Sequence, residues 1–321
     1  MNYLIIVQIS PYIIPLPGSG GLERVVYNLS IELDKMGHEV YVYAVAGSKG
    51  GGIIIPYGHR WDQWDLKEFV LQTMPDDTDV IHDHTHDLIF GEAQLSIPVV
   101  STIHTEWSKN QPVQYPVFVS ETKLRQSIHH DRGYFVHNGI DIDEYEFSKN
   151  KRDYLLFLGR IDREKGVEDA IKVAELTGMR TIIAGPPWDS ELFNELLPRI
   201  HNNPNIEYVG EVHGMAKQKL LKNAKWLLFP TACEEQFGLV MIEALACGTP
   251  VAAYPRGAVP EVLSGFPTFL CGDVYEMADK VSSPPLFSPS DLRRYVSDRF
   301  ALDKMAEKYL SIYNDVVKGG D

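Results

Sequence analysis

Short apolar runs of strand length alternate with amphipathic stretches along almost the whole chain. The first half carries the runs YLIIVQI, EVYVYAVA, DVIHDH, IPVVSTIH, PVFVS and GYFVHNG. From residue 153 the pattern starts again with DYLLFLGR, RTIIAG, IEYVG, KWLLFP and TPVAAY. Parallel strands need a crossover connection, usually a helix, because a tight hairpin joins only antiparallel neighbours. The alternation therefore predicts an α/β protein built on parallel sheets.

The restart of this pattern predicts two domains, residues 1–149 and 150–300. A chain of 321 residues is about twice the length of a typical domain of roughly 150 residues. The polar segment 141–153, DIDEYEFSKNKRD, is typical of a linker. Residues 301–321 contain a strongly helical segment, which either closes the second domain or crosses back to the first. The clearest helix, residues 22–36, has an apolar face and a glycine stop at its end.

The charge balance excludes one class of partner. Lys and Arg number 30 and Asp and Glu number 44, giving a net charge of -14. Such a chain repels the phosphate backbone, so we expect no nucleic-acid partner. The three cysteines form neither a CxxC pair nor an even set, which indicates buried thiols in a reducing compartment. The N-terminus has no basic leader, and no apolar run reaches the roughly 18 residues of a membrane span, so the expected location is the cytoplasm.

A glycine-rich loop, PLPGSGGLERVV, separates the first predicted strand from the first predicted helix. Glycines at this place let backbone N–H groups approach a phosphate at the positive end of the helix, although an ordinary turn has the same composition. Gly18 and Gly20 are followed at the third position by Glu23, so the dinucleotide fingerprint GxGxxG is not met. This departure disfavours a nicotinamide enzyme.

The second half carries two further charged patterns. In LFLGRIDREKG, Arg160 and Lys165 flank a strand-to-helix turn, where two cations either hold a diphosphate or are solvated surface residues. In EEQFGLVMIEALACG, Glu235 and Glu243 are separated by seven residues. A retaining glycosidase needs its two carboxylates about 5 Å apart, whereas eight helical residues rise about 12 Å. The two glutamates are therefore expected to contact different parts of one elongated ligand.

The stretch VIHDHTHDL gathers three histidines and two aspartates within residues 82–87. Imidazole and carboxylate are ligands of zinc and iron, and a metal-dependent hydrolase built on His82, His84 and His86 is one interpretation. The closest metal pattern, HxHxDH, is not met, because the last two positions are interchanged. The metal interpretation therefore stays an alternative.

Taken together, the segments quoted above resemble the retaining glycosyltransferases of family 4, which have the GT-B fold. The resemblance is carried by GGLERVVYNLSIELDKMGHEV, DVIHDH, VVSTIHTEW, HNGID, LLFLGRIDREKG and above all EEQFGLVMIEALACGTPVAAYPRGAVPE. It implies two Rossmann-like domains whose parallel sheets face each other across a cleft. The first domain would take the acceptor and the second the nucleotide sugar. The activity implied is transfer of a hexose from a nucleotide diphosphate sugar, most often UDP-glucose or another UDP-sugar, without a metal or other cofactor.

The resemblance also implies roles for individual residues of the donor site. Arg160 and Lys165 would neutralise the departing diphosphate, and Glu243 would bind the ribose. Glu235 would hold the sugar hydroxyls. The remaining contacts to the sugar and the phosphates would come from the backbone of Phe237, Gly238 and Leu239 and from Gly20 and Gly21.

On the acceptor side the resemblance is less detailed. His104 would lie beside the transferred sugar, and His82 and His84 would line the rim that admits the acceptor. The acceptor itself is not identified, and small molecules, polysaccharides, lipids and peptides are all used in the family. Cys233 and Gln236 depart from the residues common in relatives, which leaves the donor sugar open.

Two further interpretations remain open. A sugar-nucleotide 2-epimerase shares the GT-B architecture and the ligand class, and a catalytically silent protein would bind the donor without releasing nucleotide. The basic segment SETKLRQSIHHDRG is either a solvated helix face or a grip for an anionic acceptor or a membrane. The net negative charge makes stable membrane association unexpected.

Overall fold

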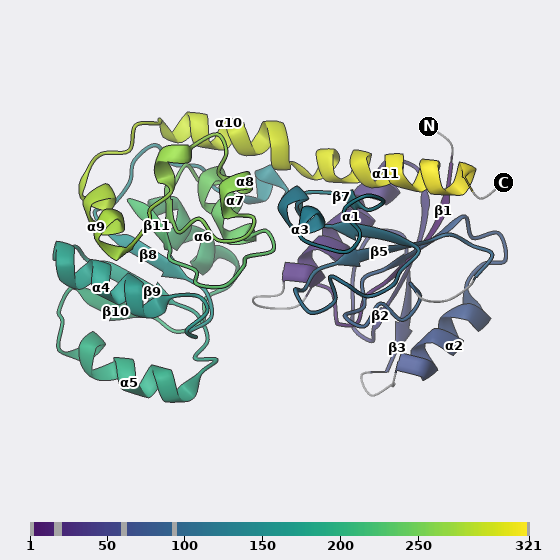
Figure 1. The fold of residues 1–321 in the computed structure, drawn as a ribbon, viewed down its shortest axis with the longest axis horizontal. Coiled ribbons are helices and arrows are strands. Elements are labelled where there is room, and N and C mark those ends of the chain that lie inside the picture. The colour runs from purple at the N-terminus through teal and green to yellow at the C-terminus, as the bar shows by residue number, and fades with distance from the viewer. Residues whose placement is uncertain (1–2, 16–20, 59–62, 92–94, 320–321) are drawn as a thin grey trace. The chain divides into compact units, whose positions relative to one another are not determined.

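The computed structural model describes residues 3–15, 21–58, 63–91 and 95–319, and these divide into two compact units. Unit 1 is formed by Met1–Ile140 together with Ala301–Asp321, and unit 2 by Asp141–Phe300 (Figure 1). Gly20, one of the two glycines expected to contact the phosphates, lies outside the described residues, as does Gly18 of the same loop.

Unit 1 is built around a seven-stranded sheet in the order β3-β2-β1-β4-β5-β6-β7, and every strand pair in it is parallel. The strands are β1 (Ile5–Ile9), β2 (Glu39–Val45), β3 (Ile53–Tyr57), β4 (Val80–Asp83), β5 (Val99–Ile103), β6 (Tyr115–Phe118) and β7 (Tyr134–Phe135). The helices are α1 (Gly21–Lys35), α2 (Gln63–Thr73), α3 (Glu121–Arg125) and α11 (Leu302–Lys318). The parallel α/β architecture predicted from the alternating pattern is confirmed.

Helix α1 ends at Lys35, one residue before the predicted last residue of the helix, and its apolar stripe is buried as expected, including Val25, Val26 and Leu29. Helix α11 packs against α1. Its Tyr309 and Tyr313 are fully buried, so the C-terminal segment is part of the core of unit 1.

Unit 2 contains a five-stranded parallel sheet in the order β10-β9-β8-β11-β12. Its strands are β8 (Leu155–Leu158), β9 (Thr181–Ala184), β10 (Ile206–Tyr208), β11 (Trp226–Phe229) and β12 (Val251–Ala253). Its α-helices are α4 (Val167–Thr177), α5 (Ser190–His201), α6 (Gly214–Asn223), α7 (Leu239–Ala246), α8 (Val259–Val262), α9 (Val274–Ser282) and α10 (Pro289–Phe300), and its 3-10 turns are η1 (Ile142–Glu144) and η2 (Pro267–Phe269).

The two units divide after Ile140, earlier than the predicted boundary after residue 149. The polar segment that was expected to be a linker is fastened to unit 2 instead. Tyr145 is buried and donates its hydroxyl to Glu243, 2.9 Å away. The ammonium of Lys151 donates to the Lys222 and Cys247 carbonyls, at 2.8 and 2.9 Å. Polar composition alone did not reveal these contacts.

Within the described residues, no helix has both the length and the apolar character needed to cross a membrane.

Candidate functional site

The turn from β8 to α4 carries Arg160 and Lys165 at the carboxyl end of the unit 2 sheet. The Arg160 guanidinium contacts Asp162 at 3.0 Å, and the other Asp162 carboxylate oxygen accepts from the Lys165 amide at 2.8 Å. Gly166 closes the turn with φ of 74°, and a Cβ there would lie 1.9 Å from the Pro230 carbonyl oxygen. Only glycine fits this position, because a side chain would meet both a strained backbone and a clash. The turn therefore fixes the backbone positions of Arg160 and Lys165.

Lys165 and Glu235 form a partly buried ion pair. The Lys165 Nζ lies 2.7 Å from the Glu235 Oε2, and the side chains are 24% and 12% exposed. Burial lowers the pKa of Lys165, but the charge and hydrogen bond of Glu235, together with the nearby Cys233, outweigh it, so the pKa is raised above its usual value. The charge of Arg160 acts on the pKa of Lys165 in the opposite direction and lowers it. The exposed ring of Trp188 lies 5.4 Å from the Arg160 guanidinium carbon.

Helix α7 presents its N-terminus directly after Glu235. Gly238 is its left-handed N-cap, and its first residue is Leu239. Phe237 is buried and packs edge-on against Phe300, so only the Phe237 backbone is suited to ligand contact. The helix covers less of the interval between Glu235 and Glu243 than the sequence suggested. The rise of about 12 Å expected for a continuous helix therefore does not apply to the whole interval, and the two glutamates are distinguished by their partners instead.

Glu243 is a buried carboxylate, 3% exposed, on helix α7. Its Oε1 accepts from Tyr145 at 2.9 Å and from the Lys217 ammonium at 2.8 Å, and its Oε2 lies 2.7 Å from the same ammonium. The ammonium of Lys217 and the hydroxyl of Tyr145 thus offset the cost of burying this carboxylate. Lys217 and Tyr145 could not be predicted as partners from the sequence, since nothing in the local pattern links them to Glu243.

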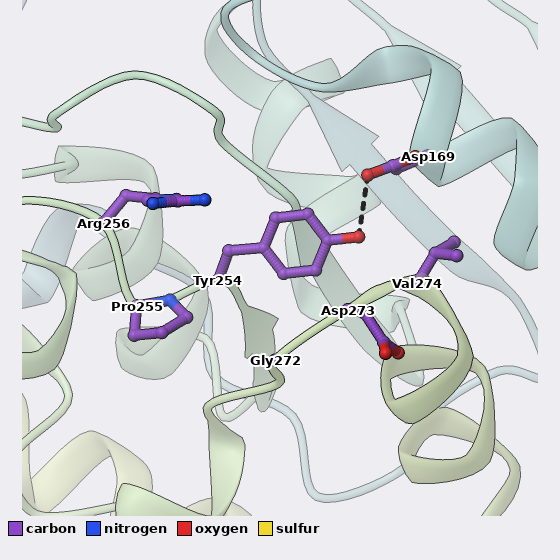
Figure 2. A pocket seen from close by; sticks show the side chains of 7 residues that line it. All are labelled: Asp169, Tyr254, Pro255, Arg256, Gly272, Asp273 and Val274. Carbon is purple, nitrogen blue, oxygen red and sulfur yellow. Dashed lines mark hydrogen bonds between the residues drawn. The ribbon is translucent and has the colours of Figure 1, made fainter.

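A cavity of about 440 Å³ lies beyond the carboxyl end of β12, also within unit 2. Figure 2 shows Tyr254 in its wall, donating its hydroxyl to Asp169 at 2.7 Å, with Arg256 and Asp273 among the other residues that line it. None of the predicted donor residues lines it. The cavity therefore does not replace the β8–α4 turn as the candidate site.

In unit 1 the structure brings His84 and His104 together. The His84 Nδ1 lies 3.0 Å from the His104 Nε2. Burial and the neighbouring His86 lower the pKa of His104 to about 3, so its imidazole is neutral at working pH. Gly21 is the exposed first residue of α1.

His82 does not line a rim, which corrects the expectation from the sequence. Its ring is fully buried beneath α11, with its Nε2 2.7 Å from the Thr102 hydroxyl and its Nδ1 2.6 Å from the Tyr313 hydroxyl. A metal ligand needs a free ring nitrogen, and both nitrogens of His82 are engaged. Among the residues that the structure describes, no group of three or more His, Cys, Asp or Glu side chains is placed to hold a metal. The metal-hydrolase interpretation loses its basis.

The basic segment 120–133, before β7, is neither the solvated helix face nor the anion-binding segment that the sequence suggested. Lys123 is 1% exposed and its ammonium lies 3.0 Å from Glu106, while His129 is buried and its Nε2 lies 2.8 Å from the Gln111 carbonyl oxygen. These side chains fasten the loop that follows β5. Because Lys123 and His129 are buried, these two side chains are neither solvated nor exposed for binding anions.

Comparison with protein-family models covers most of the chain. The model for Glycosyl transferases group 1 matches residues 140–281, and the model for Glycosyltransferase Family 4 matches residues 19–144. The chain belongs to glycosyltransferase family 4.

Individual family 4 relatives are distant in sequence. The phosphatidyl-myo-inositol mannosyltransferase of Mycobacterium leprae is 26% identical over 304 residues, which cover 80% of this chain and 80% of that protein. The N-acetyl-alpha-D-glucosaminyl L-malate synthase of Bacillus anthracis is 25% identical over 190 residues, 54% of this chain and 48% of that protein. The chain thus spans about half the length of that synthase.

Solved structures with the same architecture are found for this family 4 chain. AviGT4, a glycosyltransferase involved in avilamycin A biosynthesis, is 25% identical with a TM-score of 0.82, and the match covers 98% of both chains. Anabaena Alr3699/HepE, in complex with UDP-glucose, is 17% identical with a TM-score of 0.78, and the match covers 98% of this chain and 100% of that chain. These similarities confirm the predicted GT-B fold.

Proposed function

We propose that this chain is a retaining glycosyltransferase that moves a hexose from a nucleotide diphosphate sugar to an acceptor hydroxyl. The observation that carries the proposal is the pair of neighbouring cations, Arg160 and Lys165, on one turn at the carboxyl end of a parallel sheet. Ligands of open α/β sheets bind at this end of the strands. Two cations there stabilise the negative charge that develops on a leaving diphosphate.

In this proposal the acceptor oxygen bonds to the anomeric carbon as the bond from that carbon to the phosphate oxygen breaks. The departing diphosphate keeps the electron pair and takes the proton of the acceptor hydroxyl. Arg160 and Lys165 stabilise the charge of the diphosphate, while Glu235 orients Lys165 and accepts hydrogen bonds from the sugar hydroxyls. The N-terminus of α7, at Gly238 and Leu239, adds its partial positive charge. No protein base is required for the proton.

His104 has a separate proposed role, at the transferred sugar. Because its pKa is lowered to about 3, its imidazole is neutral and places no positive charge beside a developing oxocarbenium ion. A neutral imidazole still hydrogen-bonds a sugar hydroxyl. Glu243 is proposed to bind the ribose, with Lys217 and Tyr145 holding its carboxylate in place.

The donor that we propose is UDP-glucose or another UDP-sugar. Support comes from the family and from the Anabaena protein of the same fold, which is described in complex with UDP-glucose. The test is a panel of nucleotide sugars, with and without candidate acceptors, read by release of nucleotide diphosphate. Turnover in EDTA should equal turnover without it. Inversion at C2 of the donor without any acceptor, visible by NMR, would instead indicate a 2-epimerase.

The residue assignment is tested by Lys165→Ala and Glu243→Ala, each of which should lower kcat/KM about a hundredfold or more. The matched control is Lys172→Ala, which removes a half-exposed lysine of α4 that lies 3.8 Å from Glu175. It should keep normal kinetics. Full activity in both site variants would refute the assignment.

A further inference from the structure

Three aromatic side chains meet at the carboxyl end of the unit 1 sheet. Tyr12 follows β1, His86 follows β4 and Trp107 follows β5, and these strands are adjacent and parallel. The ring centroids of Tyr12 and His86 are 5.3 Å apart, and those of His86 and Trp107 are 6.2 Å apart. We call these three residues the aromatic platform. The sequence reasoning gave none of them a role in binding a substrate.

The Trp107 ring is exposed although its loop is firmly held. Trp107 is 56% exposed. Its neighbour Glu106 lies 3.0 Å from the ammonium of buried Lys123, and further along the loop the Gln111 carbonyl oxygen lies 2.8 Å from the His129 ring. Folding therefore fixes the backbone around the ring without covering the ring itself. A large aromatic surface on a fixed loop is pre-organised for a ligand.

The charges around the platform disfavour an anionic ligand. Burial first, and then the acidic groups Glu23 and Asp87, raise the pKa of Tyr12. Lys109 and Lys123, which contact the Trp107 loop, are both paired with Glu106. A phosphate or carboxylate would meet acidic neighbours and lysines whose charge is already compensated. A neutral ligand fits these surroundings.

Hydrogen-bonding capacity lies next to the aromatic surface. The Nε2 of His84 and the Nδ1 of His86 are buried and have no hydrogen-bond partner among the described residues. His84 is 0% exposed and is paired through its other nitrogen with His104. Buried polar atoms without partners are costly, so a ligand rich in hydroxyl groups would be stabilised here.

We propose that the aromatic platform binds a pyranose ring of a neutral carbohydrate acceptor. A pyranose combines a face of C–H bonds, which carry partial positive charge and suit the negative face of an aromatic ring, with hydroxyl groups around its edge. Trp107 and Tyr12 supply the aromatic faces, and His84 and His86 supply the hydrogen bonds. The inference rests on the proposed function, because it names the acceptor class for that reaction.

The test uses Trp107→Ala and Trp107→Phe in the full chain, with Tyr3→Ala as the matched control. Tyr3 is 59% exposed and lies just before β1, at the opposite end of the sheet. The probes are methyl α- and β-pyranosides of glucose, galactose, mannose and N-acetylglucosamine. Binding is measured by saturation-transfer NMR without donor, and turnover by nucleotide diphosphate release with the donor.

At least one methyl pyranoside should bind and accelerate diphosphate release. Trp107→Ala should raise its KM or Kd about tenfold or more, since losing one aromatic stacking contact typically has an effect of this order. Trp107→Phe should change it only about threefold, and Tyr3→Ala should leave it unchanged. Donor hydrolysis without acceptor should stay within about twofold in all three variants.

Two results separate this proposal from the proposed function. Donor hydrolysis with no pyranoside bound or used would overturn the acceptor proposal and leave the glycosyltransferase assignment standing. Pyranoside binding that depends on Trp107, in a protein that consumes no nucleotide sugar, would support the platform and refute the proposed function. Equal loss of donor hydrolysis and pyranoside binding in Trp107→Ala would also overturn the platform, because it would indicate a general structural defect.

Discussion

Lys165 keeps its charge in a partly buried position because Glu235 lies 2.7 Å from its ammonium. Burial opposes the charged form, and the carboxylate more than compensates. The cation is therefore available at any ordinary working pH. The charge on Lys165 therefore depends on Glu235, and the pH dependence of activity measures this effect.

Glu235→Gln should shift the alkaline limb of the kcat/KM profile to lower pH. Without the carboxylate, burial and the charge of Arg160 both act to lower the pKa of Lys165. The wild-type profile should hold to at least about pH 10, because the pKa of Lys165 is raised above the ordinary lysine value of about 10.4, and the variant should lose activity at a lower pH than the wild type. The measurement is kcat/KM for the donor between about pH 6 and 10.5.

The control for this prediction is Glu175→Gln, the same substitution in a surface cluster where Glu175 contacts Arg199 at 2.8 Å. Its profile should match the wild type. An unshifted alkaline limb in Glu235→Gln would show that Glu235 does not maintain the charge on Lys165, whatever happens to the height of the profile.

Single residues were predictable from sequence where the backbone alone places them. Arg160 and Lys165 follow a strand and precede a helix, so their place at the sheet edge follows from the parallel pattern. His82 lies in β4 and His84 directly follows it, and only His84 is hydrogen-bonded to His104. His82 is covered by α11, which comes more than 200 residues later in the chain. Such a contact is set by tertiary packing and leaves no local signal.

At the level of elements, strands and helices with strong periodicity were predicted well, and α1 agrees with the predicted helix 22–36 to within one residue at each end. The edge strand β3 was not predicted, although its three consecutive isoleucines are typical of a strand. Pro56 stands within it and removes one backbone donor, which an edge strand tolerates. The segment after Ile140 was misread as a linker because its polar composition hides the anchoring contacts of Tyr145 and Lys151.

A buried hydrogen bond between Tyr313 and His82 joins helix α11 to the sheet, and a single substitution deletes it. Tyr313→Phe deletes the hydroxyl that lies 2.6 Å from the His82 Nδ1 and leaves the ring in place. Because a buried nitrogen then loses its partner, unit 1 should lose about 1–3 kcal/mol of stability. Hydrogen exchange of the α11 amides should accelerate accordingly.

The matched control is Tyr275→Phe, which changes a residue of unit 2 that is 62% exposed. It should leave exchange in α11 unchanged. Unchanged α11 exchange in Tyr313→Phe would mean that this hydrogen bond does not stabilise the docked helix.

At the scale of the whole molecule, one unit is continuous in sequence and the other is not. Asp141–Phe300 contains its complete sheet, and Tyr145 and Lys151 bind within it. Unit 1 requires Ala301–Asp321, which contributes the buried Tyr309 and Tyr313. The sequence left both destinations open for the last helix, because an amphipathic helix shows that it has an apolar face and not which surface covers that face.

This asymmetry predicts how fragments of the chain fold. Residues 141–300 alone should unfold cooperatively on heating, whereas residues 1–140 alone should not, since they lack the helix that covers part of their core. Ile140 and Ala301 form an isolated parallel β-bridge, so a short flexible linker can join residues 1–140 to 301–321. That joined fragment should regain a cooperative transition and dispersed amide NMR signals. Cooperative folding of residues 1–140 without α11 would contradict the assignment of the last helix to the core of unit 1.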